Sequence, residues 1–193
     1  MIGATGLVGR EIVRQLAARA DIAEVVALVR RDPGPRPSPK VSYRVVDFTR
    51  LDDVAEVFAV REVYSALGTT RRRTPDPAAY RAIEVELPLD VLRRARAAGA
   101  TTCGLVSSVG ADPRARTSYL RQKGELEAAV TALGFPTLRI VRPSFLVGVR
   151  DEFRLGERIG LAVARIAAPL LPRAYRPIAA SEVARQVIGR GLD

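Results

Sequence analysis

Tyr119 and Lys123 are the residues of this sequence whose types and spacing best suit catalysis. They are four apart on a predicted helix, so they share one face of it. A neighbouring ammonium favours the phenolate form of a tyrosine, which can then act as a general acid or base toward a carbonyl or an alcohol. Ser108, at the end of a predicted strand, could hydrogen-bond the same substrate oxygen. Ser107 is the alternative, because a predicted strand end is defined only to within one residue.

A glycine-rich turn stands at the beginning of the chain. Gly3, Gly6 and Gly9 are three residues apart, and a helical pattern of apolar residues follows them. Glycines let the backbone approach a ligand closely, and the amide groups and dipole of a helix N-terminus favour a pyrophosphate. The pattern therefore indicates a dinucleotide site. A tight strand-to-helix turn with packing glycines is the alternative interpretation.

Predicted strands and helices alternate along the chain. Strands are predicted over 22–29, 41–46, 62–67, 102–106 and 137–141, and helices over 11–20, 51–59, 77–98, 118–133, 151–171 and 181–188. We expect Thr49 to cap the second helix and Pro88 to bend the third. The alternation predicts an α/β fold with a doubly wound parallel sheet of the Rossmann type. Ligands of such sheets bind beyond the carboxyl ends of the strands, where the candidate residues fall.

The first strand of this sheet is largely missing from the sequence. A strand usually has about 5–6 residues, yet only Met1 and Ile2 precede Gly3. The missing strand would be central, between those over 22–29 and 62–67, so its absence should open a gap of about 10 Å. We therefore expect the natural protein to begin upstream of Met1.

Composition excludes several classes of function. The 193 residues predict a single domain, in which 144–193 contributes helices on the substrate side. No histidine is present, which excludes histidine catalysis and most transition-metal sites, so no metal is expected. No run of 18 apolar residues predicts a membrane span. The lone Cys103 excludes an internal disulfide and favours a cytoplasmic location.

The net charge of +10 suggests a nucleic-acid partner. However, the arginines are spread along the chain and aromatic residues for base stacking are few. We therefore predict a small-molecule substrate and neither a nucleic-acid nor a membrane partner. The sequence leaves the oligomeric state open.

Several segments together resemble a known family. They are Gly-Ala-Thr-Gly-Leu-Val-Gly at 3–9, Val-Asp-Phe-x-x-Leu-Asp-Asp at 46–53, Leu-Gly-Thr-Thr at 67–70, Ser-Ser-x-Gly-Ala-Asp at 107–112, Tyr-Leu-x-x-Lys-Gly-Glu-x-Glu at 119–127 and Arg-Pro at 142–143. In this order they resemble the short-chain dehydrogenase/reductase superfamily. The resemblance is to its atypical branch, which contains the Tat-interacting oxidoreductase-like protein and its bacterial relatives. It covers nearly the whole chain.

The resemblance implies a role for each matching residue. The pyrophosphate would be held by Gly3, Thr5, Gly6, Leu7 and Val8, the adenine by Asp47 and Phe48, and the ribose near the nicotinamide by Leu67, Gly68 and Thr69. Pro143 would lie beside the nicotinamide. Tyr119 would be the proton donor, Lys123 would hold the ribose hydroxyls, and Ser108 would orient the substrate.

Two arginines favour NADP(H) as the cofactor. Arg30 and Arg31 stand about 20 residues past the glycines, where the adenine ribose is recognised. A guanidinium binds a phosphate with two parallel hydrogen bonds. Asp32 would instead serve NAD if the strand ended later than predicted.

The sequence supports three hypotheses of function. The first is an NADP(H)-dependent oxidoreductase of the short-chain dehydrogenase type, and the residues Tyr119 and Lys123 favour it. The second is an NADPH-binding sensor or regulatory protein without turnover, and the third is a sugar-nucleotide epimerase or dehydratase.

The run Arg71–Arg73 could attract an anionic substrate or be a solvated charge run. Glu125 and Glu127 are expected on the outer helix face.

Overall fold

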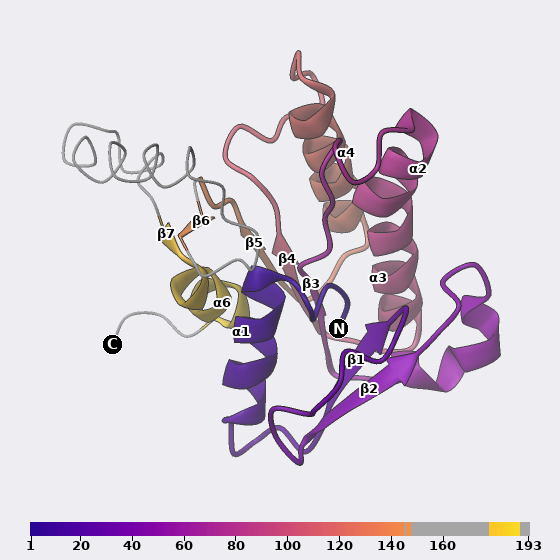
Figure 1. Cartoon of the computed structure of the whole chain (residues 1–193), viewed down its shortest axis with the longest axis vertical. Coiled ribbons are helices and arrows are strands. Elements are labelled where there is room, and N and C mark those ends of the chain that lie inside the picture. Colours follow the sequence, from indigo (N-terminus) through magenta and orange to yellow (C-terminus); the bar gives the residue numbers. More distant parts are fainter. Residues whose placement is uncertain (145, 148–177, 190–193) are drawn as a thin grey trace.

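A parallel sheet lies between two layers of helices (Figure 1). The computed structural model describes residues 1–144, 146–147 and 178–189. The strands of the main sheet are β1 (Val25–Val29), β2 (Val41–Val45), β3 (Glu62–Ser65), β4 (Thr102–Val106) and β5 (Thr137–Val141). The helices are α1 (Leu7–Ala17), η1 (Leu51–Phe58), α2 (Pro77–Arg81), η2 (Ala82–Glu86), α3 (Leu87–Ala97), α4 (Ser118–Ala132) and α6 (Ala180–Ile188). The predicted α/β fold of the Rossmann type is confirmed.

Ile2 joins the two halves of the sheet. β1 pairs with β2, and β3 pairs with β4 and β4 with β5, all in parallel. Between these halves Ile2 bridges Leu28 and Ser65. Its amide donates to the carbonyl of Tyr64 at 3.0 Å and its carbonyl accepts from the amide of Ala66 at 3.1 Å. The spatial order is therefore β2, β1, Ile2, β3, β4, β5, and every carboxyl end lies at one edge.

Each face of the sheet has its own hydrophobic core. One core is formed with α1 and α6, which lie side by side in Figure 1, and contains Val8, Ile12, Val13, Leu16, Ala27, Tyr64, Val183 and Val187. The other is formed with η1, α3 and α4, and contains Leu28, Leu51, Val63, Val91, Leu92, Leu105, Leu126 and Val130. The buried residues of α1 recur with helical spacing, which explains why this segment forms a helix against the sheet.

The long helix predicted over 77–98 contains a π-helical turn. Asp76 caps its first part by accepting the amide of Ala79 at 2.6 Å, and Pro77 occupies the first turn. The π turn η2 comes directly before Pro88, the residue expected to bend the helix. Proline has no amide to donate to the carbonyl four residues earlier, which here belongs to Glu84. The missing bond gives a physical reason for the wider turn at this place.

Other predicted features differ in detail. η1 is a 3-10 helix whose N-cap position is Arg50, with no capping hydrogen bond from a side chain, so the prediction of Thr49 as its cap is wrong. The amide and hydroxyl of Thr49 instead donate to Asp47. The pair of short strands β6 (Leu146–Val147) and β7 (Ile178–Ala179) was not predicted. The helix predicted over 151–171 lies outside the described residues.

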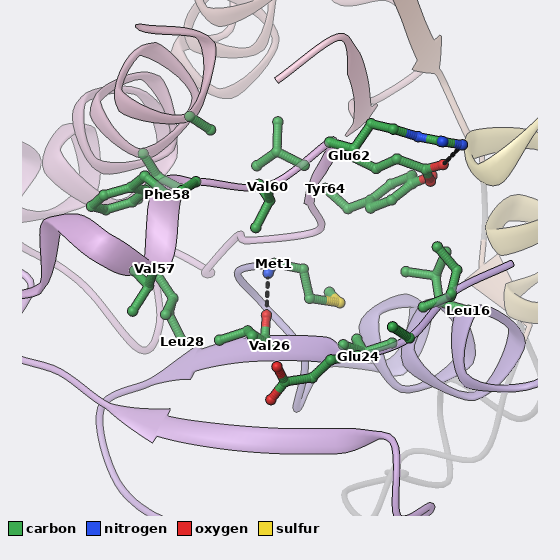
Figure 2. A pocket seen from close by; sticks show the side chains of 18 of the residues that line it. Met1, Leu16, Glu24, Val26, Leu28, Val57, Phe58, Val60, Glu62 and Tyr64 are labelled. Carbon is green, nitrogen blue, oxygen red and sulfur yellow. Dashed lines mark hydrogen bonds and ion pairs between the residues drawn. The ribbon is translucent and has the colours of Figure 1, made fainter. Parts of the chain in front are cut away.

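A cavity of about 460 Å³ separates β1 from β3 on the amino side of Ile2. Figure 2 shows Met1 in this space, with its amino group donating to the carbonyl of Val26. Burial lowers the pKa of that amino group to about 5. The amide of Leu28 donates to the carbonyl of Met1, and because groups alternate along a strand, the amide of Val26 also faces the cavity. The lining includes Leu16, Leu28, Val57, Phe58 and Val60.

We expect an extension of four β-branched residues before Met1 to stabilise the fold by adding a strand in this cavity. Burying one such side chain contributes about 1.5–3 kcal/mol. For a chain of this size each kcal/mol moves the Tm by about 2–4 °C. Thermal denaturation should therefore show a rise of at least about 3 °C, with a Gly-Ser extension of equal length as the control. Equal melting temperatures for the two extensions would contradict this.

Candidate cofactor and active site

The glycine turn lies against the end of β3. Gly3 has a φ of +77°, and a Cβ there would lie 2.4 Å from the carbonyl carbon of Ala66. A Cβ on Gly9 would lie 1.9 Å from the oxygen of Gly3. Any side chain at either position would clash with backbone. Gly3 and Gly9 are therefore required by packing, whether or not a ligand binds.

The first turn of α1 is not capped by a side chain. Gly6 is its N-cap and has no side chain to cap the first-turn amides, which lack partners within a helix. A Cβ at Gly6 would approach the oxygen of Gly3 at 3.4 Å, which the fold can tolerate. Thr5 and Gly6 are exposed, whereas Val8 is buried in the core. Because its side chain is buried, Val8 could contact a pyrophosphate only through its backbone.

Tyr119 and Lys123 lie on one face of α4. The Nζ atom of Lys123 is 6.0 Å from the centre of the Tyr119 ring. Tyr119 is 38% exposed, whereas the side chain of Lys123 is only 5% exposed. The ring can therefore meet a substrate from solvent while the ammonium stays beneath it.

Glu84 is a site residue that the sequence analysis missed. Its Oε2 atom is 2.8 Å from Nζ of Lys123, and its Oε1 atom accepts the amide of Thr69 at 2.5 Å. The side chain of Glu84 is 1% exposed. A Cβ at Gly68 would lie 3.4 Å from Oε1 and 3.8 Å from Nζ, so Gly68 passes close over the ion pair. The available signal was the position of a glutamate between Ile83 and Val85 on a helix.

Tyr80 and Arg71 continue this cluster toward the surface. Burial, and then the Glu84 carboxylate and Tyr119, raise the pKa of Tyr80 to about 12, while Arg71 acts in the opposite direction. The guanidinium of Arg71 lies 4.2 Å from the centre of the Tyr80 ring and donates to the hydroxyl of Ser118 at 2.8 Å. The first residue of the run Arg71–Arg73 is thus held beside Tyr119 rather than solvated alone.

The serines lie where β4 meets β5. The amide of Ser107 donates to Val141 at 2.8 Å, and that of Val109 donates to Pro143 at 3.0 Å. Pro143 is therefore held beside the two serines. Ser107 is buried, and its Oγ has no hydrogen-bond partner among the described residues. Ser108 is half-buried, with one long contact of 3.4 Å from Oγ to the carbonyl of Val109.

The residues expected at the adenosine end lie after β1 and β2. Arg30 and Arg31 are exposed directly beyond β1. Asp47 is exposed, and its carboxylate accepts the hydroxyl of Thr49 at 2.7 Å and its amide at 2.9 Å. These two bonds lower the pKa of Asp47. Phe48 packs against the hydrophobic core, and Leu67 does the same after β3.

Glu127 is not on the outer helix face, so that prediction is wrong. It is 6% exposed, and its carboxylate accepts Nε of Arg142 at 3.0 Å. This pair ties α4 to the end of β5 next to Pro143. Glu125 pairs with Arg81 at 2.6 Å.

Two further properties concern the described residues alone. They contain no group of three or more His, Cys, Asp or Glu residues that could hold a metal ion. None of their helices is both long and apolar enough to cross a membrane.

Comparison with known proteins decides the family. The sequence profile described as NAD(P)H-binding matches residues 3–157. The chain belongs to this NAD(P)H-binding family. Its fold binds a nicotinamide cofactor, and the matched range contains the glycine turn, both serines, Tyr119 and Lys123.

Curated relatives agree with the resemblance found in the sequence. Protein FMP52, mitochondrial, of Coccidioides immitis is 34% identical over 213 residues, covering 100% of this chain and 84% of that protein. Protein HTATIP2 of Rattus norvegicus is 33% identical over 160 residues, covering 81% of this chain and 66% of that protein. The resemblance to the branch of the Tat-interacting oxidoreductase-like protein is confirmed. Because FMP52 relatives from several fungi are named mitochondrial, the predicted cytoplasmic location is contradicted. A single cysteine was not sufficient to predict the cellular compartment of the protein.

Solved structures share the fold. The UDP-glucose 4-epimerase of Thermotoga maritima superposes with a TM-score of 0.72 at 13% identity, over 97% of this chain and 71% of that one. A putative NAD-dependent epimerase/dehydratase of Bacillus halodurans gives 0.64 at 21% identity, over 95% and 82%. At these identities the likeness concerns the fold alone.

Two glycine variants should separate packing from binding. Gly3→Ala forces a Cβ against the backbone at a positive φ, so we expect a loss of at least about 2 kcal/mol in the free energy of unfolding. Gly6→Ala should cost less than about 1 kcal/mol, yet weaken NADPH binding about tenfold or more because its methyl group lies where the pyrophosphate would approach. Thermal denaturation and fluorescence titration measure the two effects. Unchanged NADPH affinity in Gly6→Ala would place the pyrophosphate elsewhere.

Proposed function

We propose that this protein binds NADP(H) and transfers a hydride between the nicotinamide and the carbonyl or alcohol of a small molecule. The observation that carries the proposal is the position of Tyr119 and Lys123. They share one face of α4, and Lys123 lies against Gly68–Thr69. This segment follows β3, in the same way that the two serines follow β4. These strand ends and the glycine turn belong to one edge of the sheet.

The described residues fit such a cofactor. The uncapped N-terminus of α1 suits the pyrophosphate, with the backbone of Gly3–Val8 around it. Lys123 would hold the ribose hydroxyls next to Thr69, and Pro143 would lie beside the nicotinamide. The buried Oγ of Ser107, which has no partner in the described part of the chain, supports a polar ligand at this edge. When bound, NADPH supplies the hydride, because no side chain can.

The protein's own part in carbonyl reduction is to hold the substrate and move one proton. Ser108 would orient the substrate oxygen by a hydrogen bond. The hydroxyl of Tyr119 would give its proton to that oxygen as the carbonyl carbon receives the hydride, so that an alcohol and NADP⁺ result. Lys123 would favour the phenolate left on Tyr119. Because Tyr119 is partly exposed, solvent can return the proton.

The surroundings of Arg30 and Arg31 support NADP(H) over NAD(H). β1 ends at Val29, so both arginines follow it directly. The carboxylate of Asp32 accepts the amide of Gly34 at 2.9 Å and is engaged within its own loop. The arginines are therefore better placed than Asp32 to meet a ribose substituent.

A second candidate is an NADPH-binding sensor without turnover. The ion pair between Lys123 and Glu84 favours it, because a carboxylate at 2.8 Å offsets the charge that would act on Tyr119. Binding of NADPH without turnover of any compound in a carbonyl and alcohol panel would support the sensor.

Tyr119→Phe tests the catalytic assignment. The substitution removes only a hydroxyl from a partly exposed ring, so folding and NADPH affinity should stay close to those of the wild type. Turnover should fall by roughly 10²–10⁴-fold, the usual contribution of a positioned acid. The measurement is NADPH absorbance with a carbonyl substrate, and Tyr43→Phe, on β2, is the matched control. Wild-type turnover in Tyr119→Phe would show that another group gives the proton.

Replacing Arg30 and Arg31 by serine tests the cofactor preference. We expect the double variant to bind NADPH about tenfold or more weakly and NADH as the wild type does, because only NADPH has the phosphate that a guanidinium recognises. Arg36→Ser, an exposed arginine of the same loop, is the control. If wild-type protein binds NADH as tightly as NADPH, the proposed preference is wrong.

A further inference from the structure

Three chain segments meet at the carboxylate of Glu84. One oxygen faces the ammonium of Lys123 from α4, and the other accepts the amide of Thr69, which follows β3. Glu84 itself comes from the π turn η2. The contacts span 39 residues of sequence on one side and 15 on the other, so one side chain links elements that are distant in sequence.

A buried ion pair of this kind is poor at stabilising a fold. Both side chains are almost fully buried, and removing two charges from water costs several kcal/mol for each. Well-packed apolar residues of similar volume often give equal or greater stability. In addition, Oε2 lacks a hydrogen bond of good geometry although it lies 2.8 Å from Nζ. Stability alone therefore does not explain why a glutamate occupies this position.

The π turn places the carboxylate. One wider turn changes which residues of the helix face α4 and the segment after β3, and such turns are frequent at functional sites. Tyr80 from α2 is close enough to Glu84 for the carboxylate to raise its pKa, and Tyr119 and Arg71 lie near Tyr80 in turn. Lys123 is the group that the structure places in direct ionic contact with Glu84.

We propose that Glu84 is the positioning residue of the site: it fixes the ammonium of Lys123 and the backbone at Thr69 in the arrangement that receives the ribose near the nicotinamide. This inference rests on the proposed function. Glu84 does not touch the reacting atoms. It acts through Lys123, by holding that group in place, and through Thr69, by holding the loop that follows β3.

The test compares Glu84→Gln, Glu84→Asp and Glu62→Gln with the wild type. Glutamine keeps an acceptor for Thr69 but leaves Lys123 without its anion. Aspartate keeps the charge, but its side chain is one methylene too short to reach both partners. Glu62→Gln is the matched control, because the side chain of Glu62 is also largely buried and paired with an arginine, at the opposite end of β3. NADPH affinity is measured by fluorescence titration, together with the Tm of each variant.

We expect Glu84→Gln to bind NADPH about tenfold or more weakly. Glu84→Asp should restore part of the binding, with an affinity between those of the wild type and Glu84→Gln. Glu62→Gln should change the Tm but not the affinity.

Wild-type affinity in Glu84→Gln, even with a lower Tm, would show a merely structural role and overturn the proposal. If Glu84→Gln does not fold, Glu84→Asp decides: an affinity about threefold or more below the wild type supports the proposal, and wild-type affinity overturns it. A wild-type protein that binds neither NADPH nor NADH overturns both this inference and the proposed function. If the wild-type protein binds NADPH and the Glu84 variants bind it equally well, this inference alone is overturned.

Discussion

The pairing of Ile2 with both β1 and β3 is the constraint on which the rest of the structure depends. Its bonds join a two-stranded and a three-stranded half into one sheet. They also fix where the chain leaves the sheet, so that Gly3 lies against the backbone of Ala66 and Leu67. The N-terminus of α1 is thereby brought to the carboxyl edge. A shift of one residue at Ile2 would move the glycine turn away from β3 and turn a buried side chain to the opposite face of the sheet.

The proposed site combines backbone geometry with a buried ion pair. Its phosphate side would use glycines and helix amides, which need no side chains. The proposed catalytic side would use α4, which the buried ion pair of Lys123 with Glu84 ties to the long helix and to the segment after β3. Glu127 of α4 also pairs with the exposed side chain of Arg142 after β5. Tyr119 thus projects from a helix held by side-chain contacts, which is how a site on a rigid element keeps its geometry.

Periodicity and strand ends predicted much of this arrangement. The ranges of β4 and β5 agree with those expected, because each is a short run rich in apolar and β-branched residues that stops at polar residues. The approach of Tyr119 to Lys123 followed from helix spacing. Glu84 could not be predicted, because its partners are distant in sequence and the π turn changes the helix face. The prediction that Thr49 caps η1 was wrong, because Asp47, two residues earlier, accepts hydrogen bonds from its amide and hydroxyl.

Amide hydrogen exchange with and without NADPH tests the central claim most directly, namely that the cofactor lies at the carboxyl edge on both sides of Ile2. The account predicts that NADPH slows exchange in residues 3–9 and 67–69, with little change at the far ends of the strands. The cavity between β1 and β3 serves as the internal comparison, because it lies on the opposite side of Ile2. Protection confined to residues 57–60 in that cavity, or no protection at the glycine turn, would contradict the account.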